Sequence, residues 1–452
     1  MSNTTAQENK MGVMPIPKLL ITMSLPMILS MLVQALYNVV DSIFVAKLSE
    51  DALTAVSLAF PIQNLMIAIS TGTGVGINAL LSRHLGEHRF DDANKVAKNG
   101  IFLAFISSVI FALVGVLNAH TFFITQTSNP LIVKYGTQYM QIITFCSIGI
   151  FMQITFERLM QSTGKTFYNM VTQGLGAIIN IILDPILIFG MFGLPRLEVA
   201  GAALATVIGQ IIAVLLSLFF NCTKNTEINI NMKTFRPHMD TIIAIYKIGI
   251  PSIIMQSIGS VMTFGMNKIL LMFSSTAAAV FGVYFKLQSF IFMPIFGLTN
   301  GMIPIVAFNY GAKNKKRISE TLKLSAIIAV SIMILGTILF QAVPDTLLSF
   351  FEASDHLMEI GVPALRIISI SFAMAGFSII CSSMFQALGN GVYSLLTSIA
   401  RQLVVILPAA YIFAKILGLH AVWWSFPIAE FVCLVMSALL LKRIFRLKIS
   451  KL

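Results

Sequence analysis

Two acidic side chains lie inside long apolar stretches of the sequence. Asp41 and Asp184 stand about five or six residues before the ends of their stretches. An ionisable group in hydrocarbon costs about 3 kcal/mol or more, so each carboxyl group requires a specific partner or a function. If both stretches are helices that rise about 1.5 Å per residue, the two carboxyl groups lie at one depth, roughly 8 Å below the same membrane surface. We therefore predict that they share a cavity.

Each aspartate ends a polar stripe with the spacing of one helix face. One stripe is Gln34, Tyr37, Asn38 and Asp41, and the other is Gln173, Asn180 and Asp184. Spacings of three, four and seven residues bring side chains to the same face of a helix. Two carboxyl groups shielded from water can hold a proton at neutral pH or, with an amide oxygen, can ligate Na⁺, a cation that prefers oxygen ligands. The alternatives are that Asp41 caps a helix end near Lys47 and that Asp184 only precedes the helix-bending Pro185.

Helices that cross a membrane are expected to hold these residues. Of the 452 residues, 57% are hydrophobic and 11% are charged, whereas a soluble domain has roughly 25% charged residues. The apolar runs are near the ~20 residues that a helix needs to cross a bilayer. The polar segment up to Pro17 lacks the pattern of a cleaved signal peptide, so the first span is expected to be retained. We predict an all-α integral membrane protein with 12 transmembrane helices, at roughly 19–46, 52–80, 97–118, 131–156, 167–190, 199–221, 243–273, 278–308, 321–343, 360–386, 393–416 and 421–441.

The net charge of +12 is distributed as in a membrane protein rather than a nucleic-acid-binding protein. About 22 of the 30 Lys and Arg residues, Arg158 among them, fall in the termini and loops on one side of the 12 spans, and about five fall on the other. The positive-inside rule then places both termini in the cytoplasm. His84 and His88 have the spacing of two metal ligands on a helix, but no acidic or cysteine partners follow them, so we expect no metal site there.

The sequence repeats itself at a shift of 225 residues. The shift pairs Pro26 with Pro251, Gln63 with Gln288, Gly72 with Gly297, Gly76 with Gly301 and Gln161 with Gln386. Because each copy has six helices, an even number, both copies enter the membrane in one direction and are related by a pseudo-two-fold axis along the membrane normal. We predict an N-terminal lobe over 1–222, a cytoplasmic linker over 223–240 and a C-terminal lobe over 241–452, with a cleft between the lobes. Pro26 and Pro251 are expected to bend the first helix of each copy.

The two copies differ in their charges. The two aspartates have no acidic counterpart in the second copy, where Met266 aligns with Asp41. We therefore expect only the first lobe to bind an ion. The second lobe has Arg401 and Glu430 within predicted spans, and we predict that these two form an internal ion pair.

Amide, aromatic and cationic residues are candidates for a substrate site in the cleft. The chain has 25 Met and 35 Phe residues. Flexible apolar walls with scattered amides suit loosely specific binding of bulky, partly aromatic ligands. The residues assigned to this site are Gln34, Gln63, Gln256, Tyr284, Lys286 and Gln288.

Several of these segments together resemble the multidrug and toxic compound extrusion (MATE) family over nearly the whole chain. The segments are Pro26 and Asp41, Gln161-Ser-Thr-Gly164, Asn180-x-x-x-Asp184-Pro185, Val199-Ala-Gly-Ala-Ala203 and Trp423-Trp-Ser-Phe-Pro427. The pattern is most similar to the branch of the DNA-damage-inducible F proteins and to the staphylococcal-type multidrug pumps.

The resemblance implies a transporter rather than an enzyme, exporting organic cations and drugs in exchange for H⁺ or Na⁺. In that branch, residues matching Asp41, Asn180 and Asp184 form the coupling site, with tyrosines matching Tyr37 and Tyr139 nearby. Protonation goes with bending at the proline that matches Pro26. Some relatives add a threonine near Ala202 as an ion ligand; Ala202 cannot coordinate, which weakens the case for Na⁺ at this site. The expected setting is the bacterial inner membrane, with a monomeric, cofactor-free, multi-pass protein that confers antibiotic resistance.

Two other functions compete with drug export. A lipid-linked oligosaccharide flippase of the same superfamily would need a basic cavity, for which Lys286, Arg366 and Arg401 are candidates. A membrane-embedded protease would need motifs that are absent here, since Asp41 and Asp184 lack the glycine-flanked contexts of paired-aspartate proteases. We therefore expect antiport.

Overall fold

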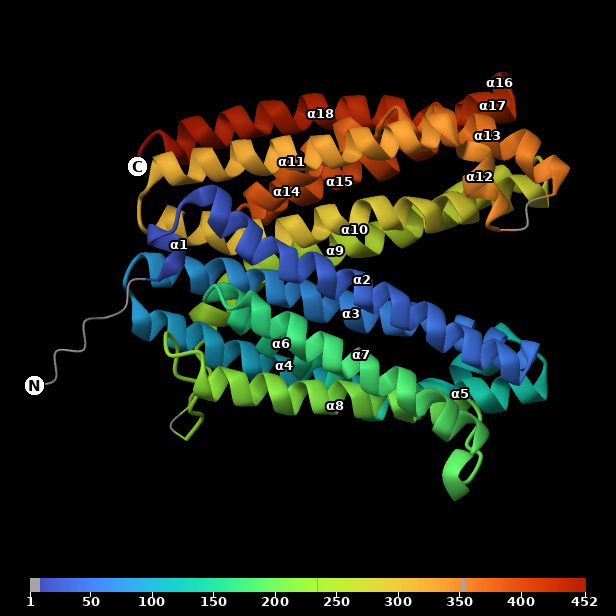
Figure 1. Cartoon of the computed structure of the whole chain (residues 1–452), viewed down its shortest axis with the longest axis horizontal. Helices are drawn as coiled ribbons and strands as arrows, with labels where there is room; N and C mark the ends of the chain where they lie inside the picture. The colour runs from blue at the N-terminus through green and yellow to red at the C-terminus, as the bar shows by residue number, and fades with distance from the viewer. Residues whose placement is uncertain (1–8, 234, 352–353) are drawn as a thin grey trace, which may run out of the picture. The chain divides into compact units, whose positions relative to one another are not determined.

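The computed structural model describes residues 9–233, 235–351 and 354–452, and the regular structure within them is helical throughout (Figure 1). By contacts, the chain divides into two compact units. We call Leu29–Gly249 the N-unit, and the segment ending at Ile28 together with Ile250–Leu452 the C-unit. Each unit is described by itself.

The described part of the N-unit has six complete α-helices and parts of two helices that it shares with the other unit. It contains the later part of α2 (Ile16–Leu48), then α3 (Glu50–Gly86), α4 (Phe90–Gln126), α5 (Pro130–Phe145), α6 (Ile148–Ser162), α7 (Thr166–Phe189), the 3₁₀ turn η1 (Met191–Gly193), α8 (Val199–Thr223) and the start of α9 (Met239–Leu270).

The C-unit has the first part of α2 and the rest of α9, with several short helices. Its other elements are α1 (Lys10–Val13), α10 (Ser275–Gly311), α11 (Lys315–Ala342), α12 (Pro344–Ser349), α13 (Asp355–Ser369), α14 (Phe372–Ala387), α15 (Gly391–Ile399), the π-helical η2 (Ala400–Ile406), α16 (Leu407–Ile416), α17 (Leu419–Val422), α18 (Ser425–Ile444) and the π-helical η3 (Phe445–Ile449).

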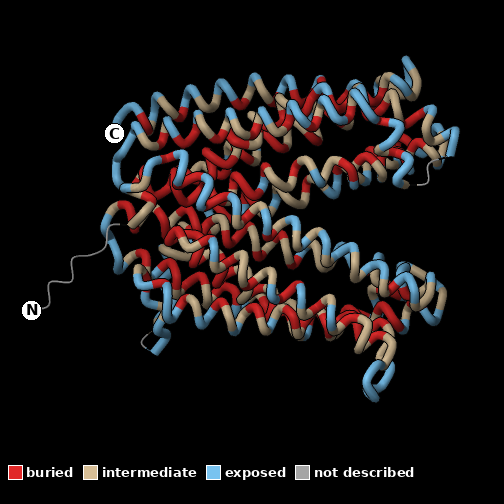
Figure 2. Tube along the Cα trace, viewed as in Figure 1, coloured by how far each residue is buried: buried red, intermediate tan, exposed pale blue. Residues whose placement is uncertain are grey.

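The helices confirm an all-helical, multi-span protein. Among the described residues, 10 helices are long and apolar enough to cross a membrane, and two bent pairs bring the number to 12 if each pair is one span. Large apolar side chains such as Leu113 and Leu117 of α4 are 60% and 78% exposed, as expected of surfaces that face lipid. Figure 2 shows this pattern in both units, with buried residues where helices face one another and exposed residues along their outer sides.

Two predicted spans are not the continuous helices that the sequence suggested. The span over 131–156 is the pair α5 and α6, bent by 44°, and the span over 360–386 is the pair α13 and α14, bent by 50°. Each break contains a serine whose hydroxyl donates to a backbone carbonyl: Ser147 to Ser108 at 3.0 Å, and Ser371 to Ile368 at 2.6 Å. Such bonds compete with helical ones, and no proline marks either break, so hydropathy alone could not reveal them.

The two prolines lie where long helices pass between the units. Helix α2 leaves the C-unit after Ile28, two residues beyond Pro26, and α9 leaves the N-unit after Gly249, just before Pro251. A proline inside a helix removes one backbone hydrogen bond and allows a bend. The units thus exchange segments: each contains the first part of the helix whose remainder belongs to the other.

Glycines at the 225-residue shift make corresponding contacts within their units. In the N-unit, a Cβ on Gly76 of α3 would lie 3.1 Å from the Ile245 carbonyl carbon of α9. In the C-unit, a Cβ on Gly301 of α10 would lie 2.9 Å from the Cα of Ser24 in α2. A side chain at either glycine would push the helices apart. The paired glycines therefore hold the exchanged segments against their units.

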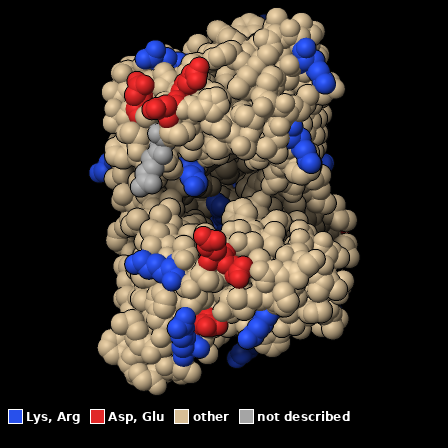
Figure 3. All heavy atoms as spheres, turned by 90° about the vertical axis from the view of Figure 1, so that its right-hand side faces the viewer, with Lys and Arg blue, Asp and Glu red and all other residues tan. Residues whose placement is uncertain are grey.

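The two described ends of the chain lie at the same end of the C-unit (Figure 1). There, the Arg317 guanidinium donates to the carbonyl oxygens of Met11 at 2.9 Å and Met14 at 2.8 Å. The Lys448 ammonium donates to the Leu388 carbonyl at 2.7 Å. Two ends on one side fit an even number of spans, as the 12-helix prediction requires. The opposite ends of the helices are viewed in Figure 3, where charged side chains are scattered among uncharged atoms.

The predicted linker over 223–240 joins α8 to α9 and is fixed to α4 of the same unit. The backbone amide of Asn229 donates to Asn94 Oδ1 at 2.6 Å, and that of His238 donates to Asn99 Oδ1 at 3.0 Å. Several Lys and Arg residues that were assigned to loops, such as Arg83, Lys95 and Arg158, lie within the ends of helices, because these helices extend beyond the predicted spans.

Candidate functional site

The site is built on α7, where Asp184 and Asn180 lie one turn apart. The Asp184 side chain is fully buried and Asn180 is 3% exposed. Pro185 stays within α7, but it has no N–H to donate to the carbonyl four residues earlier, at Ile181. The polar stripe that the sequence predicted therefore faces the interior of the N-unit.

Close packing between α7 and α8 brings a third polar residue to the site. A Cβ on Gly176 would lie 3.1 Å from the Gly209 carbonyl oxygen, so the helix backbones nearly touch there. One turn along, Asn180 can donate its amide to Asp184 Oδ2 at 3.3 Å in the orientation in which its oxygen accepts from the Thr206 backbone N–H at 3.1 Å. Thr206 Oγ1 also lies 3.3 Å from the Asn180 amide. Asn180 thus connects Asp184 to α8.

The other aspartate comes from α2. The carboxyl groups of Asp41 and Asp184 face each other within hydrogen-bonding range. A hydrogen bond between two carboxyl groups requires a proton on one of them. The structure therefore brings the two predicted residues together, as their depths suggested.

Two tyrosines and a glutamine complete the cluster. Tyr37 and Tyr139 both lie close enough to interact electrostatically with Asp41 and Asp184. Tyr139 is 2% exposed, and its hydroxyl accepts a 2.8 Å hydrogen bond from Gln63 Nε2. Gln63, which we had assigned to the substrate site, is thereby also part of the surroundings of the carboxyl pair.

One oxygen of each aspartate lacks a protein partner. Asp41 Oδ1 and Asp184 Oδ1 are buried, and neither has a hydrogen-bond partner among the described residues. Lys47, the neighbour that could have neutralised Asp41, instead lies with its ammonium 5.8 Å from the Phe44 ring centroid. Buried carboxyl oxygens without donors are suited to bind a proton or a cation, because both supply the missing positive charge.

The described residues include no set typical of a firmly held metal. Among the described residues, no three His, Cys, Asp or Glu side chains lie together as a metal site would require. Ala202 is fully buried and offers no side-chain oxygen, and the nearby Thr206 hydroxyl lies beside Asn180. His84 Nδ1 lies 3.2 Å from Glu87 Oε2. Partial burial opposes ionisation of Glu87, but hydrogen bonds from Arg83 and His84 outweigh it and hold the pKa of Glu87 below its ordinary value.

The residues assigned to the substrate site belong to both units. Gln34 and Gln63 lie in the N-unit, and Gln256, Tyr284, Lys286 and Gln288 lie in the C-unit. Gln34 is exposed, and Gln256 and Gln288 are half-buried. Tyr284 is only 4% exposed and packs against Phe281 and Phe426. Lys286 is exposed, with its ammonium 5.8 Å from the Phe351 ring centroid.

The predicted ion pair of the C-unit is confirmed. Arg401 Nη1 donates to Glu430 Oε1 at 3.1 Å, between η2 and α18. Arg401 lies in a π-helical segment that precedes Pro408 of α16. This segment replaces part of the continuous helix predicted over 393–416.

Sequence reasoning missed one buried carboxyl group. Glu157 of α6 is 5% exposed and lies just past the end of the span predicted over 131–156. Helix α6 continues to Ser162, beyond the predicted span, and therefore includes Glu157. Its position opposite Gln173 of the second polar stripe was the signal that could have indicated it.

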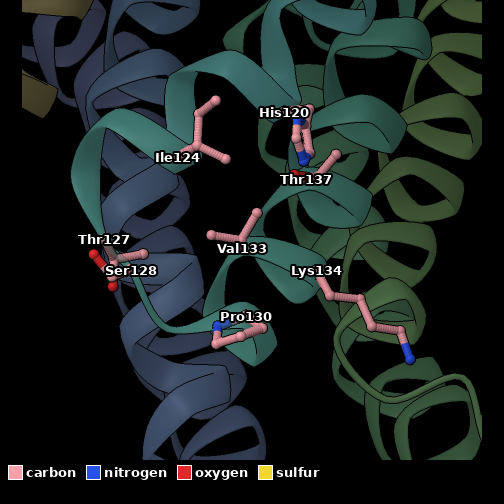
Figure 4. Close-up of a pocket in the computed structure, with 8 residues that line it drawn as sticks. All are labelled: His120, Ile124, Thr127, Ser128, Pro130, Val133, Lys134 and Thr137. Carbon is pink, nitrogen blue, oxygen red and sulfur yellow. The ribbon is translucent and has the colours of Figure 1, made fainter.

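A pocket also lies between the end of α4 and the start of α5. Its volume is about 560 Å³. Figure 4 shows His120 close to Thr137, and the Lys134 side chain extending away from them. None of the residues predicted for ion or substrate binding lines this pocket, whose lining residues are His120, Ile124, Thr127, Ser128, Pro130, Val133, Lys134 and Thr137.

Comparison with known proteins places the chain in a family. The chain is 28% identical over 418 residues to the multidrug export protein MepA of Staphylococcus haemolyticus, covering 92% of this chain and 91% of that protein. It is 26% identical over 427 residues to MepA of Staphylococcus aureus MRSA252, covering 94% and 93% of the two chains. Among solved structures, a MOP superfamily transporter from Pyrococcus furiosus superposes with a TM-score of 0.90 at 25% identity, covering 97% of this chain and 98% of that one.

A family model described as MatE matches two segments of the chain, residues 26–186 and 251–412. These segments begin at Pro26 and Pro251, the two prolines that the 225-residue shift aligns. Together they cover most of the chain, and the chain therefore belongs to the MatE family of multi-pass membrane transporters.

Proposed function

We propose that this protein is a secondary antiporter that exports organic cations and related drugs in exchange for H⁺ or Na⁺. The observation that carries the proposal is the pair of facing, buried carboxyl groups of Asp41 and Asp184, each with an oxygen that lacks a protein donor. The staphylococcal relatives are named multidrug export proteins, which supports drugs as the substrate class. A monomer in the bacterial inner membrane, with both termini in the cytoplasm, completes the proposal.

Coupling requires that the ion and the substrate favour opposite conformations. Asp41 lies on the part of α2 that belongs to the N-unit, 15 residues beyond Pro26. At about 1.5 Å per residue this is roughly 22 Å along one helix. Occupying the carboxyl pair removes the repulsion between two ionised groups, so Asp41 can approach Asp184 only when the ion is bound. We propose that α2 transmits this change to its bend at Pro26, and that Pro251 allows the matching change in α9.

The surroundings of the pair favour H⁺ over Na⁺. Asn180 satisfies both of its neighbours when its amide nitrogen is placed toward Asp184 and its oxygen toward Thr206, an orientation assigned from hydrogen bonding. A sodium ion would need oxygen ligands directed at it, whereas Ala202 supplies none. Gln34, Gln63, Gln256, Tyr284, Lys286 and Gln288 remain our candidates for contacting substrate.

The test uses the purified full-length chain in proteoliposomes, with ethidium as the transported probe. We expect efflux driven by an imposed pH gradient alone, and no efflux driven by either gradient in Asp41→Asn and Asp184→Asn. Efflux that requires a Na⁺ gradient would instead assign Na⁺ to the aspartate pair. Absence of wild-type efflux of ethidium and of a fluoroquinolone under both gradients would contradict drug antiport and favour lipid-linked oligosaccharide flipping.

A further inference from the structure

A second buried carboxyl group lies in the N-unit, at the far end of the helix that carries Asp184. Glu157 is five residues from the end of α6 at Ser162, which at about 1.5 Å per residue is roughly 8 Å. Asp184 is five residues from the opposite end of the bundle, at Phe189 of α7. The two carboxyl groups therefore lie toward opposite membrane surfaces.

The surroundings of Glu157 are built from hydrogen-bond donors. Gln153 Nε2 donates to Oε1 at 3.0 Å, and Gln173 Nε2 donates to Oε2 at 2.6 Å. Thr172 Oγ1 lies 3.5 Å from Oε1. The Asn169 amide fixes the same turn by donating to the Glu157 backbone carbonyl at 2.8 Å. Donors on both oxygens stabilise the carboxylate form of Glu157. They do not form a sodium site, because Na⁺ would require oxygen ligands directed at it.

Few charges act on Glu157. The charged group that interacts with it is Arg158, its neighbour on α6, whose guanidinium donates to Gln161 Oε1 at 2.7 Å. Helix α3 packs against the Arg158 stem at Gly74. Helix α7 contributes amides and a hydroxyl, and α8 contributes Asn221, whose amide donates to the Phe156 carbonyl at 3.0 Å. No ion pair is recorded for Glu157 within the described chain, so its charge is stabilised by dipoles and can be lost to a proton.

One face of α7 connects the two carboxyl groups. Asn169, Gln173, Asn180 and Asp184 follow one another at spacings of four, seven and four residues. The interval between Gln173 and Asn180 contains Gly176, where α8 approaches closely. The gap of about 10 Å between Gln173 and Asn180 is too long for a hydrogen bond. The two carboxyl groups are therefore separate sites that no continuous chain of hydrogen bonds connects.

We propose that Glu157 is a second proton-binding site of the N-unit, separate from the Asp41–Asp184 pair, and that it binds and releases its own proton in each transport cycle. This inference rests on the proposed antiport function. Proton binding at Glu157 itself, however, can be measured without any transport.

The first experiment is therefore infrared difference spectroscopy of the wild-type protein in bilayers, between acidic and mildly alkaline buffer. We expect a carboxylic C=O band that Glu157→Gln removes, while Asp41→Asn and Asp184→Asn leave it in place. The matched control is Glu198→Gln, a partly exposed carboxylate of the same unit that accepts a 2.8 Å hydrogen bond from the Tyr135 hydroxyl. Identical difference spectra for wild type and Glu157→Gln would overturn the proposal, whether or not the protein transports drugs.

The second measurement separates proton release from folding. In proteoliposomes, Glu157→Gln should lower pH-driven ethidium efflux about 10-fold, whereas ethidium counterflow, which needs no net proton movement, should stay within about 2-fold of wild type. Glu157→Asp should recover part of the driven efflux. Equal loss of both fluxes in Glu157→Gln, with no recovery in Glu157→Asp, would mean a structural role and contradict the proposal.

A third variant keeps the carboxyl group and changes its surroundings. Gln173→Leu removes the 2.6 Å donor to Oε2. Loss of a donor to the charged form favours the protonated form, so the Glu157 band should persist into more alkaline buffer. An unchanged pH dependence of the band would show that the titrating group is elsewhere.

Discussion

The two units treat buried acidic groups in opposite ways. In the N-unit, Asp41 and Asp184 face each other, and each has an oxygen that lacks a partner among the described residues. In the C-unit, Glu430 Oε2 likewise lacks a partner among the described residues, but Glu430 Oε1 has a permanent cationic partner, Arg401, at 3.1 Å. A buried charge needs a counter-charge or a proton. In the C-unit the protein itself supplies the counter-charge. In the N-unit the proton or cation has to come from solution and can leave again.

This difference explains why one acidic site suits coupling and the other suits structure. An ion that binds reversibly changes the free-energy difference between two conformations. A fixed ion pair stabilises both conformations equally as long as its two residues stay together. We therefore expect neutralising substitutions to affect transport in the N-unit and folding in the C-unit.

The largest effect should come from neutralising the N-unit pair. Asp184→Asn and Asp41→Asn should each reduce gradient-driven efflux by about 100-fold, because an amide of nearly the same shape cannot exchange a proton. This corresponds to about 2.7 kcal/mol in the rate. Efflux from proteoliposomes is the measurement, and size-exclusion profiles equal to wild type are the control for folding. Wild-type efflux in both variants would end the assignment of the coupling site.

Neutralising the acidic partner of the C-unit ion pair should lower the stability of the protein rather than its transport. Glu430→Gln leaves the Arg401 guanidinium without its countercharge, and we expect a loss of about 3 kcal/mol of unfolding free energy. This is the lower end for a buried pair, because 26% of the Arg401 side chain is exposed. Denaturant titration in detergent measures it.

Replacing both Arg401 and Glu430 also tests whether this ion pair has a structural role only. Arg401→Met with Glu430→Leu should recover most of that stability, since a matched apolar pair is often neutral. The protein that remains folded should couple normally. Loss of coupling in the stable double variant would show that the C-unit pair also takes part in ion exchange.

The sequence could predict the buried acidic groups to different degrees. Asp41, Asp184 and the Arg401–Glu430 pair were identifiable because charges are rare in apolar helices and helical spacing fixes their face and depth. Glu157 was not, because the predicted span ended one residue before it, whereas α6 continues to Ser162. Sequence patterns place the ends of helices only to within about two to four residues. Likewise, the exchange of segments near Pro26 and Pro251 depends on tertiary contacts. In the sequence, only the aligned prolines and glycines indicated where these contacts are.

Asn180 should have a smaller effect than the aspartates it supports. Asn180→Ala removes one donor to Asp184 Oδ2 and the contact with Thr206. Losing a hydrogen bond to a charged group costs about 1.5 kcal/mol, so the affinity for the coupling ion should change by about 10-fold. The dependence of efflux on external pH measures this change. Thr397→Ala is a matched control, because this buried C-unit threonine hydroxyl donates only to the Ser394 carbonyl at 2.8 Å; an equal effect there would contradict a specific role for Asn180.

The smallest expected effect compares the two prolines directly. Pro26 and Pro251 both lie where a long helix passes between the units, but only α2 carries an aspartate beyond its proline. Pro26→Ala should slow exchange about 5-fold, because restoring one hydrogen bond of about 1 kcal/mol opposes the bend. Pro251→Ala should change the rate by less than about 2-fold. Ethidium exchange in proteoliposomes measures both variants, and equal slowing would mean that bending is a property of both units and is independent of where the ion binds.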